Sequence, residues 1–195
     1  TRTGTRMSGL YLASQSPRRT ELLHQVGIDH TVVTSSYVED NVVITDPIEM
    51  VKAQALGKAR CADHVPEGSI VLGADTIVVF DGKVLGKPHS KDEARAMLRT
   101  LSGQVHSVIT GVALLIKGRE IVFHNETKVY FKTLQDFEIE SYIDSMEPMD
   151  KAGAYGIQGK GALWVDKIEG SYTNVVGLPV EHVYEELCKA LGVKS

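Results

Sequence analysis

The chain has 195 residues, a length that is typical of one domain with a full hydrophobic core. Its hydrophobic fraction of 43% is ordinary for a globular protein, and its net charge of −4 offers no basic footprint for DNA or RNA. No apolar run approaches the roughly 20 residues of a membrane span, and no signal peptide is visible. We expect a cytoplasmic protein without nucleic-acid or membrane partners, with an N-terminal extension at 1–6 and a single domain over 7–195.

Apolar runs and turn signals predict alternating strands and helices. A buried strand over 10–13 leads into a helix that begins at Ser16-Pro17, because Ser at the N-cap followed by Pro is a favoured pairing. Asp46 and Ser90 begin two further helices, and Asp81-Gly82 predicts a hairpin turn. Other strands are expected at 31–33, 69–80, 83–85, 105–116, 120–132 and 162–168, and other helices at 134–145 and 179–191.

This alternation of helices and hairpins predicts an α/β fold with a mixed sheet. The closing helix, 179–191, is expected to turn Val183, Tyr184, Leu187 and Leu191 inward. Cys61 and Cys188 have no metal-like spacing, so we expect free thiols in a reducing compartment.

A cationic turn rich in hydroxyl groups joins the first strand to the first helix. Residues 14–19 read SQSPRR, which places Arg18 and Arg19 in the first helical turn. The positive end of a helix dipole disfavours cations there, whereas exposed amides, hydroxyls and guanidiniums together favour an anion such as phosphate. By itself the segment also fits a plain capped helix with arginines on its surface.

Asp75 interrupts the strongly apolar run 71–79. An ionised carboxylate in such surroundings is costly unless it is paired or bound to a metal. Gly73, two residues earlier, indicates the close approach of a ligand or a neighbouring backbone. Asp75 could therefore hold a divalent ion, act as a general base, or both; the alternative is a strand-end carboxylate that faces solvent.

Three further features are weak when taken singly. Lys87 lies between Gly86 and Pro88, where it could contact a phosphate or belong to a surface turn. Lys58 flanks the apolar stripe of the second helix and by itself fits a snorkelling side chain. The glycine-rich stretch 150–159 could approach a flat ligand closely or form a structural turn. The sequence holds no P-loop and no dinucleotide-binding glycine motif.

Taken together, these segments resemble the Maf family of nucleotide pyrophosphatases, in the right order over roughly residues 10–190. The matching stretches are 12–23 (LASQSPRRTELL), 72–76 (LGADT), 86–88 (GKP), 101–103 (LSG), 150–159 (DKAGAYGIQG) and 176–179 (VGLP). One departure is Gln15, where a small residue such as Gly is expected; it adjoins the phosphate loop and could tune the site.

The resemblance implies a fold like that of the inosine triphosphatase superfamily, an elongated mixed sheet flanked by helices with a central cleft. It also implies hydrolysis of a nucleoside triphosphate between its α and β phosphates, which yields the monophosphate and pyrophosphate and requires a divalent metal, Mg²⁺ or Mn²⁺. A homodimer is implied as well.

By position, the resemblance makes Asp75 the proton acceptor and a metal ligand, with Glu39 as a second acidic residue near the metal. Four residues match phosphate-binding positions: Ser14, Arg19, Lys58 and Lys87. Three others resemble the branch of the family that acts on dTTP and UTP: Arg18, Thr76 and Gln158.

Two other functions stay open. One is a non-catalytic nucleotide-binding regulator of septum formation, because proteins of the family have been linked to septum arrest in bacteria. The other is a house-cleaning hydrolase for modified purine triphosphates. A regulator would need the basic loop but not Asp75, so a carboxylate in an unfavourable apolar strand favours catalysis.

Overall fold

A computed structural model describes residues 9–39 and 44–193, so the predicted extension at 1–6 lies outside the described residues. The strands are β1 (Leu10–Leu12), β2 (Thr31–Val32), β3 (Ile70–Phe80), β4 (Lys83–Leu85), β5 (Val105–Ile116), β6 (Arg119–Phe131) and β7 (Val165–Glu169). The α-helices are α1 (Pro17–Gln25), α2 (Pro47–Arg60), α3 (Lys91–Leu101), α4 (Asp136–Asp144), α5 (Tyr172–Val176) and α6 (Val180–Leu191). Short 3-10 turns are η2 (Glu147–Asp150), η3 (Ala152–Ala154) and η4 (Lys160–Trp164).

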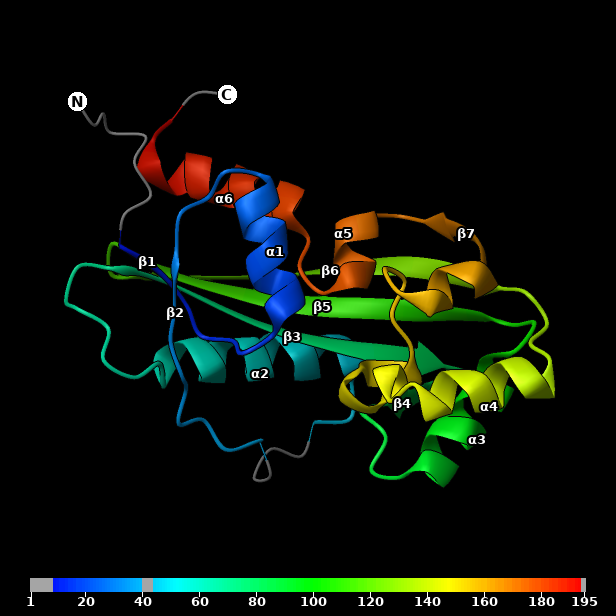
Figure 1. Ribbon diagram of the computed structural model, residues 1–195. Helices are drawn as coiled ribbons and strands as arrows, with labels where there is room; N and C mark the ends of the chain where they lie inside the picture. The colour runs from blue at the N-terminus through cyan, green and yellow to red at the C-terminus, as the bar shows by residue number, and fades with distance from the viewer. Residues whose placement is uncertain (1–8, 40–43, 194–195) are drawn as a thin grey trace. The chain divides into compact units, whose positions relative to one another are not determined.

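The strands form one seven-stranded sheet in the order β2-β1-β3-β5-β6-β7, with β4 paired to β3 (Figure 1). Strand β1 runs parallel to β2 and β3, whereas the β3–β4 and β6–β7 pairs are antiparallel. The predicted α/β fold with a mixed sheet and flanking helices is therefore confirmed.

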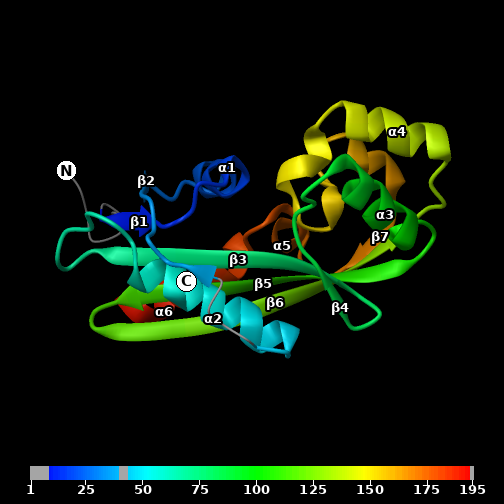
Figure 2. The ribbon, with the colours of Figure 1, turned by 90° about the horizontal axis from the view of Figure 1, so that it is seen from below.

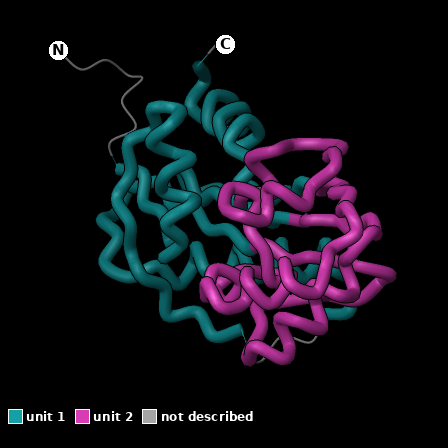
Figure 3. The backbone as a smooth tube through the Cα atoms, turned by 45° about the vertical axis from the view of Figure 1, so that its right-hand side comes forward, with its two compact units in different colours: residues 1–75, 110–125, 177–195 teal, residues 76–109, 126–176 magenta. Residues whose placement is uncertain are grey.

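Two compact units make up the chain, and each is described by itself (Figure 3). Unit 1 comprises residues 1–75, 110–125 and 177–195, and unit 2 comprises 76–109 and 126–176. Strands β3, β5 and β6 contribute residues to both units.

In unit 1, helices α2 and α6 lie on opposite faces of the strands (Figures 1 and 2). The contact between α2 and the sheet is built from small residues: Ala13, Ala55, Ala59, Val71 and Ala113 form one buried cluster. A Cβ atom on Gly73 would overlap the carbonyl oxygen of Ala55. These small side chains allow α2 to approach β3 closely, which matters for the site described below.

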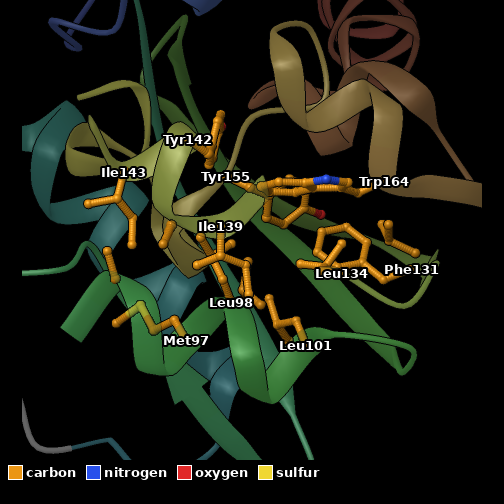
Figure 4. Close-up of a cluster of buried hydrophobic side chains, with 14 of the residues drawn as sticks. Met97, Leu98, Leu101, Phe131, Leu134, Ile139, Tyr142, Ile143, Tyr155 and Trp164 are labelled. Carbon is orange, nitrogen blue, oxygen red and sulfur yellow. The ribbon is translucent and has the colours of Figure 1, made fainter. Parts of the chain in front are cut away.

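In unit 2, helices α3 and α4 pack over a core of large aliphatic and aromatic side chains (Figure 4). Tyr142 of α4 meets the Trp164 ring edge-on, with ring centroids 4.8 Å apart. Tyr155 meets Phe131 in the same manner at 4.7 Å. Tyr155 belongs to the glycine-rich stretch 150–159, so this core anchors that segment.

Local signals correctly predict where three of the helices begin. The hydroxyl oxygen of Ser16 accepts the amide of Arg19, Asp46 accepts that of Ile48, and Ser90 accepts that of Glu93. The Asp81-Gly82 turn joins β3 to β4 as expected. Both cysteines are free thiols, as predicted.

Three expectations about elements were wrong or incomplete. Strand β7 begins at Val165 rather than at 162, because residues 160–164 form the turn η4. Tyr184 does not face inward but is 48% exposed, and α6 instead buries Val180, Val183, Leu187, Cys188 and Ala190. The short helix α5 was not predicted.

Among the described residues, no helix combines the length and the apolar character needed to cross a membrane.

Candidate active site

Two carboxylates converge on one lysine in unit 1. The Nζ atom of Lys58 lies 3.0 Å from an oxygen of Asp75 and 3.0 Å from an oxygen of Glu39. The side chains of Lys58 and Asp75 are 23% and 16% exposed, so this pair is largely shielded from water. Lys58 is therefore an ion-pairing residue and not merely a snorkelling flank of α2, and Asp75 does not stand alone in its apolar strand.

The geometry of β3 explains why Asp75 reaches this lysine. Alternate residues of a strand point to the same face, so Gly73 and Asp75 share one face. Gly73 packs against Ala55 and Ala59 of α2. That close approach brings Lys58, one residue before Ala59, within reach of the carboxylate.

The segment that carries Glu39 is fastened to the same helix. Ser35 donates a hydrogen bond of 2.7 Å to the carbonyl oxygen of Lys58. The ring of Tyr37 occupies the space that a side chain at Gly57 would fill. Burial raises the pKa of the Tyr37 phenol, and the charges of Glu39 and Asp75 raise it further. Glu39 thus reaches Lys58 from a segment that packs on α2.

Arg19, in the first turn of α1, donates hydrogen bonds to two oxygen atoms. Its Nη1 atom donates to the hydroxyl oxygen of Ser14 at 2.9 Å, and its Nε atom donates to the carbonyl oxygen of Gly177 at 2.7 Å. Burial lowers the pKa of Arg19 to about 10, whereas the carboxylate of Asp75 raises it and the charge of Arg18 lowers it. The guanidinium remains a cation at neutral pH, in the electrostatic field of Asp75.

The charges of this cluster nearly balance. Arg18, Arg19 and Lys58 supply three positive charges, and Glu39 and Asp75 supply two negative charges, which leaves a net charge of +1. Arg18 is half-buried. Ser14 also accepts the amide of Ser16, so its hydroxyl oxygen receives two hydrogen bonds and its proton is left to donate.

The remaining predicted residues belong to unit 2. Thr76 shares a face of β3 with Val78, whose side chain packs against Gly153. Lys87 is exposed in the loop after β4, and this loop is tied to the glycine-rich stretch because Gly153 donates its amide to the carbonyl oxygen of Gly86 at 3.1 Å. Gln158 is exposed in the same stretch.

Gly177 contacts the candidate site residue Arg19 through its backbone, and the sequence did not predict this contact. The motif 176–179 was part of the resemblance, but nothing in the sequence indicated that its backbone would hold Arg19 over a separation of 158 positions. Gly177 has a φ angle of +142°, a conformation that other residues rarely adopt. The glycine itself was the available signal, although its partner could not be read from it.

The carboxylate pair fits a hard divalent cation. Glu39 and Asp75 already converge on one cation, and oxygen atoms are the ligands that Mg²⁺ prefers. Within the described residues, no group of three or more His, Cys, Asp or Glu side chains could hold a metal. Mg²⁺ commonly binds through one or two carboxylates together with the phosphates of a substrate, so two carboxylates are a sufficient protein share.

Comparison with known proteins assigns the chain to a family. Residues 9–190 match the family described as Maf-like protein. A protein of Symbiobacterium thermophilum named dTTP/UTP pyrophosphatase is 51% identical over 93% of this chain and 93% of its own length. Proteins of the same name from Bacillus cytotoxicus (48% identity, 93% of this chain and 95% of the relative) and Carboxydothermus hydrogenoformans (52%, 91% and 96%) are similarly related. This protein is therefore a member of the Maf-like protein family.

Proposed function

We propose that this protein hydrolyses nucleoside triphosphates between the α and β phosphates, with UTP and dTTP as preferred substrates. The observation that carries the proposal is the cluster of Ser14, Arg19, Lys58, Glu39 and Asp75, which combines cations for phosphate with a pair of carboxylates. Its relatives in three bacteria are named dTTP/UTP pyrophosphatase, which supports the choice of substrate.

In the proposed reaction, a water molecule attacks the α-phosphorus in line with the leaving pyrophosphate. Asp75 accepts the proton of that water, since an ionised carboxylate is a suitable general base. The attack forms one P–O bond and breaks the bond between the α-phosphorus and the bridging oxygen. No covalent intermediate with the protein is required.

The cations of unit 1 neutralise the charge that grows on the leaving group. Arg19, whose Nε and Nη1 atoms donate to Gly177 and Ser14, would contribute its positive charge beside the phosphates, and the proton of the Ser14 hydroxyl would add a hydrogen bond. Lys58 would exchange part of its pairing with the two carboxylates for a phosphate oxygen. Such fixed charges stabilise a transition state without reorganisation at the moment of reaction.

A divalent cation, Mg²⁺ or Mn²⁺, belongs to this proposal. Glu39 and Asp75 would hold it, and it would supply positive charge next to the phosphate oxygens. The carboxylates would then be released from sole dependence on Lys58 for neutralisation.

Four further residues carry roles that the family resemblance implies. Lys87 is assigned to the phosphates, and Arg18 of unit 1, Thr76 and Gln158 are assigned to the base. A glutamine amide suits uracil and thymine because it can donate to a ring carbonyl and accept from the N3–H group at once.

We also propose that residues 7–195 form one catalytic domain and that the protein acts as a homodimer. We place it in the cytoplasm, without nucleic-acid or membrane partners.

A panel of triphosphates tests the proposal, with pyrophosphate release as the readout in Mg²⁺ or Mn²⁺. The panel holds UTP, dTTP, the other normal nucleotides and modified purine nucleotides. Preference for UTP and dTTP supports the proposal. Preference for modified purines would favour the house-cleaning function, and tight binding without any hydrolysis would favour a regulator.

A further inference from the structure

The segment on either side of Gln158 is held by one carboxylate outside the cluster described above. An oxygen of Glu147 accepts the amide of Lys160 at 3.4 Å. Its other oxygen accepts the hydroxyl of Tyr142 at 2.6 Å, and that hydroxyl in turn accepts the amide of Gly156 at 3.0 Å. Glu147 therefore fixes the backbone two residues before and two residues after Gln158.

These contacts lie where the segment leaves the core of unit 2. Tyr142 is only 2% exposed, and its ring packs against Trp164. Burial of the phenol and its hydrogen bond to Glu147 hold the pKa of Tyr142 well above its ordinary value. The hydroxyl therefore stays protonated and can donate to Glu147 while it accepts from Gly156.

Two glycines make room for this arrangement. A Cβ atom at Gly159 would overlap both carboxylate oxygens of Glu147. A Cβ atom at Gly156 would lie 2.6 Å from Cε of Lys151, whose ammonium group donates to the carbonyl oxygen of Glu147 at 2.7 Å. The side chains of Glu147 and Lys151 thus account for glycine at positions 159 and 156, on either side of Gln158.

The backbone before Glu147 is strained. Met146 has a φ angle of +67°, which is unfavourable for a residue with a side chain, and the residue is 54% exposed. Strain of this kind persists where the surrounding structure requires it, often next to functional positions. Here the unusual conformation ends α4 and delivers Glu147 to the glycine-rich segment.

We propose that Glu147 is a positioning residue for Gln158 and thereby sets the preference for pyrimidine bases. The proposal rests on the function proposed above, in which Gln158 contacts the base. If the segment around Gln158 were mobile, binding of the base would have to pay the entropy cost of ordering it. A segment that is held on both sides of Gln158 reduces this cost and limits the directions in which the amide can point. Glu147 itself contacts the segment rather than the substrate.

The test is the Glu147→Gln variant, with kcat and KM measured separately for UTP and for GTP. The substituted amide keeps the size of the side chain but replaces one acceptor oxygen with a donor, which then faces an N–H or O–H donor. We expect kcat/KM for UTP to fall roughly tenfold, mostly through KM, as lost hydrogen bonds of a charged group typically cause. The ratio of kcat/KM for UTP over GTP should fall at least about threefold.

Three comparisons make the result specific. Asp144→Asn removes an exposed carboxylate at the end of α4, three residues before Glu147, and should leave the ratio unchanged. Tyr142→Phe removes only the bridging hydroxyl and should lower the ratio, which keeps the proposal testable if Glu147→Gln does not fold. In a Gln158→Ala background, Glu147→Gln should change the ratio no further, because the two residues act in series.

An unchanged ratio in folded Glu147→Gln, or an equal effect with and without Gln158, would overturn the proposal. Failure of the underlying function would already appear in the wild-type protein, which would then release no pyrophosphate from UTP or would prefer purine nucleotides.

Discussion

At the scale of single residues, Asp75 combines a structural cost with a chemical use. Asp75 lies in β3, a largely apolar strand in which most other residues are buried, and its charge is matched by Lys58 at 3.0 Å. A carboxylate that served only the fold could be replaced by an apolar residue together with its partner at little cost. The proposed function gives a reason for the presence of Asp75, because its carboxylate would act as the general base.

Replacing Asp75 with Asn should preserve the fold and abolish most turnover. The amide is nearly isosteric, but it can neither accept the proton nor bind a divalent cation well. General-base catalysis alone contributes roughly 10²- to 10⁴-fold. Steady-state kinetics with UTP checks this, with Asp166→Asn, an exposed carboxylate of β7, as the control. Retention of more than about a tenth of the wild-type kcat would exclude Asp75 as the base.

Replacing Arg19 with Lys should be damaging although both residues are cationic. The guanidinium reaches Ser14 with Nη1 and Gly177 with Nε, a forked geometry that a single ammonium group cannot reproduce. Burial that lowers the pKa of Arg19 to about 10 would also depress the pKa of a lysine there, toward neutral pH. We expect kcat/KM for UTP to fall at least about tenfold.

The matched control for that variant is Arg60→Lys. Arg60 is an exposed cation of the same unit that pairs with Glu120, and exposed pairs of this kind contribute little. If Arg19→Lys and Arg60→Lys both match the wild type in kcat/KM, positive charge alone suffices at position 19.

At the scale of elements, the close packing of α2 on β3 determines whether Lys58 meets Asp75. Replacing Gly73 with Ala would place a methyl group against the carbonyl oxygen of Ala55 and 2.9 Å from the amide nitrogen of Ala59. Backbone cannot move aside as a side chain can, so overpacking of about 1–3 kcal/mol is expected. Urea denaturation should show this loss of unfolding free energy.

The comparison for that prediction is Gly86→Ala. A Cβ atom at Gly86 would meet nothing within 4 Å, and the residue does not have a positive φ angle. This variant should be as stable as the wild type. Equal stability of the two alanine variants would contradict the close contact between α2 and β3.

The elements themselves could largely be predicted, because their signals are local. Caps at Ser16, Asp46 and Ser90 and the turn at Asp81-Gly82 each depend on neighbours within a few residues. The predicted start of a strand at 162 was wrong because residues 160–164 form a 3-10 turn, with Trp164 in the core, before β7 begins. Periodicity alone does not distinguish the two.

The candidate site is harder to predict from the sequence than the helices and strands, because its contacts join residues that are far apart in the chain. The residue types at Arg19, Lys58 and Asp75 were recognisable from broken local rules and from the family resemblance. Their partners were not, since the bond from Arg19 to Gly177 spans 158 positions. The sequence around Glu39 does not distinguish it from a solvated loop residue, whereas in the structure its carboxylate lies 3.0 Å from Nζ of Lys58.

At the scale of the whole molecule, one buried histidine should make stability depend on pH. His106 is buried in unit 2, and its Nε2 atom lies 2.7 Å from the hydroxyl of Tyr155. Its Nδ1 atom has no hydrogen-bond partner among the described residues. Burial lowers the pKa of His106 to about 4, against about 6.5 in an unfolded chain.

Because the unfolded state binds the proton more readily, unfolding becomes easier as pH falls. The stability that neutral His106 provides is complete above about pH 6.5 and is lost progressively down to about pH 4, at roughly 1 kcal/mol per pH unit. Urea denaturation between pH 7 and pH 4 measures this. His106→Gln should weaken the dependence, and identical pH profiles for variant and wild type would show that His106 does not titrate in this way.

The most direct test of the proposed chemistry is hydrolysis of UTP in ¹⁸O-labelled water with Mg²⁺, because it shows which product receives the oxygen atom of the attacking water. Chromatography and mass spectrometry of the products give both the bond that is broken and the phosphorus that is attacked. We expect UMP that carries one ¹⁸O atom, together with unlabelled pyrophosphate. Formation of UDP and orthophosphate, or ¹⁸O in the pyrophosphate, would contradict attack of water on the α-phosphorus.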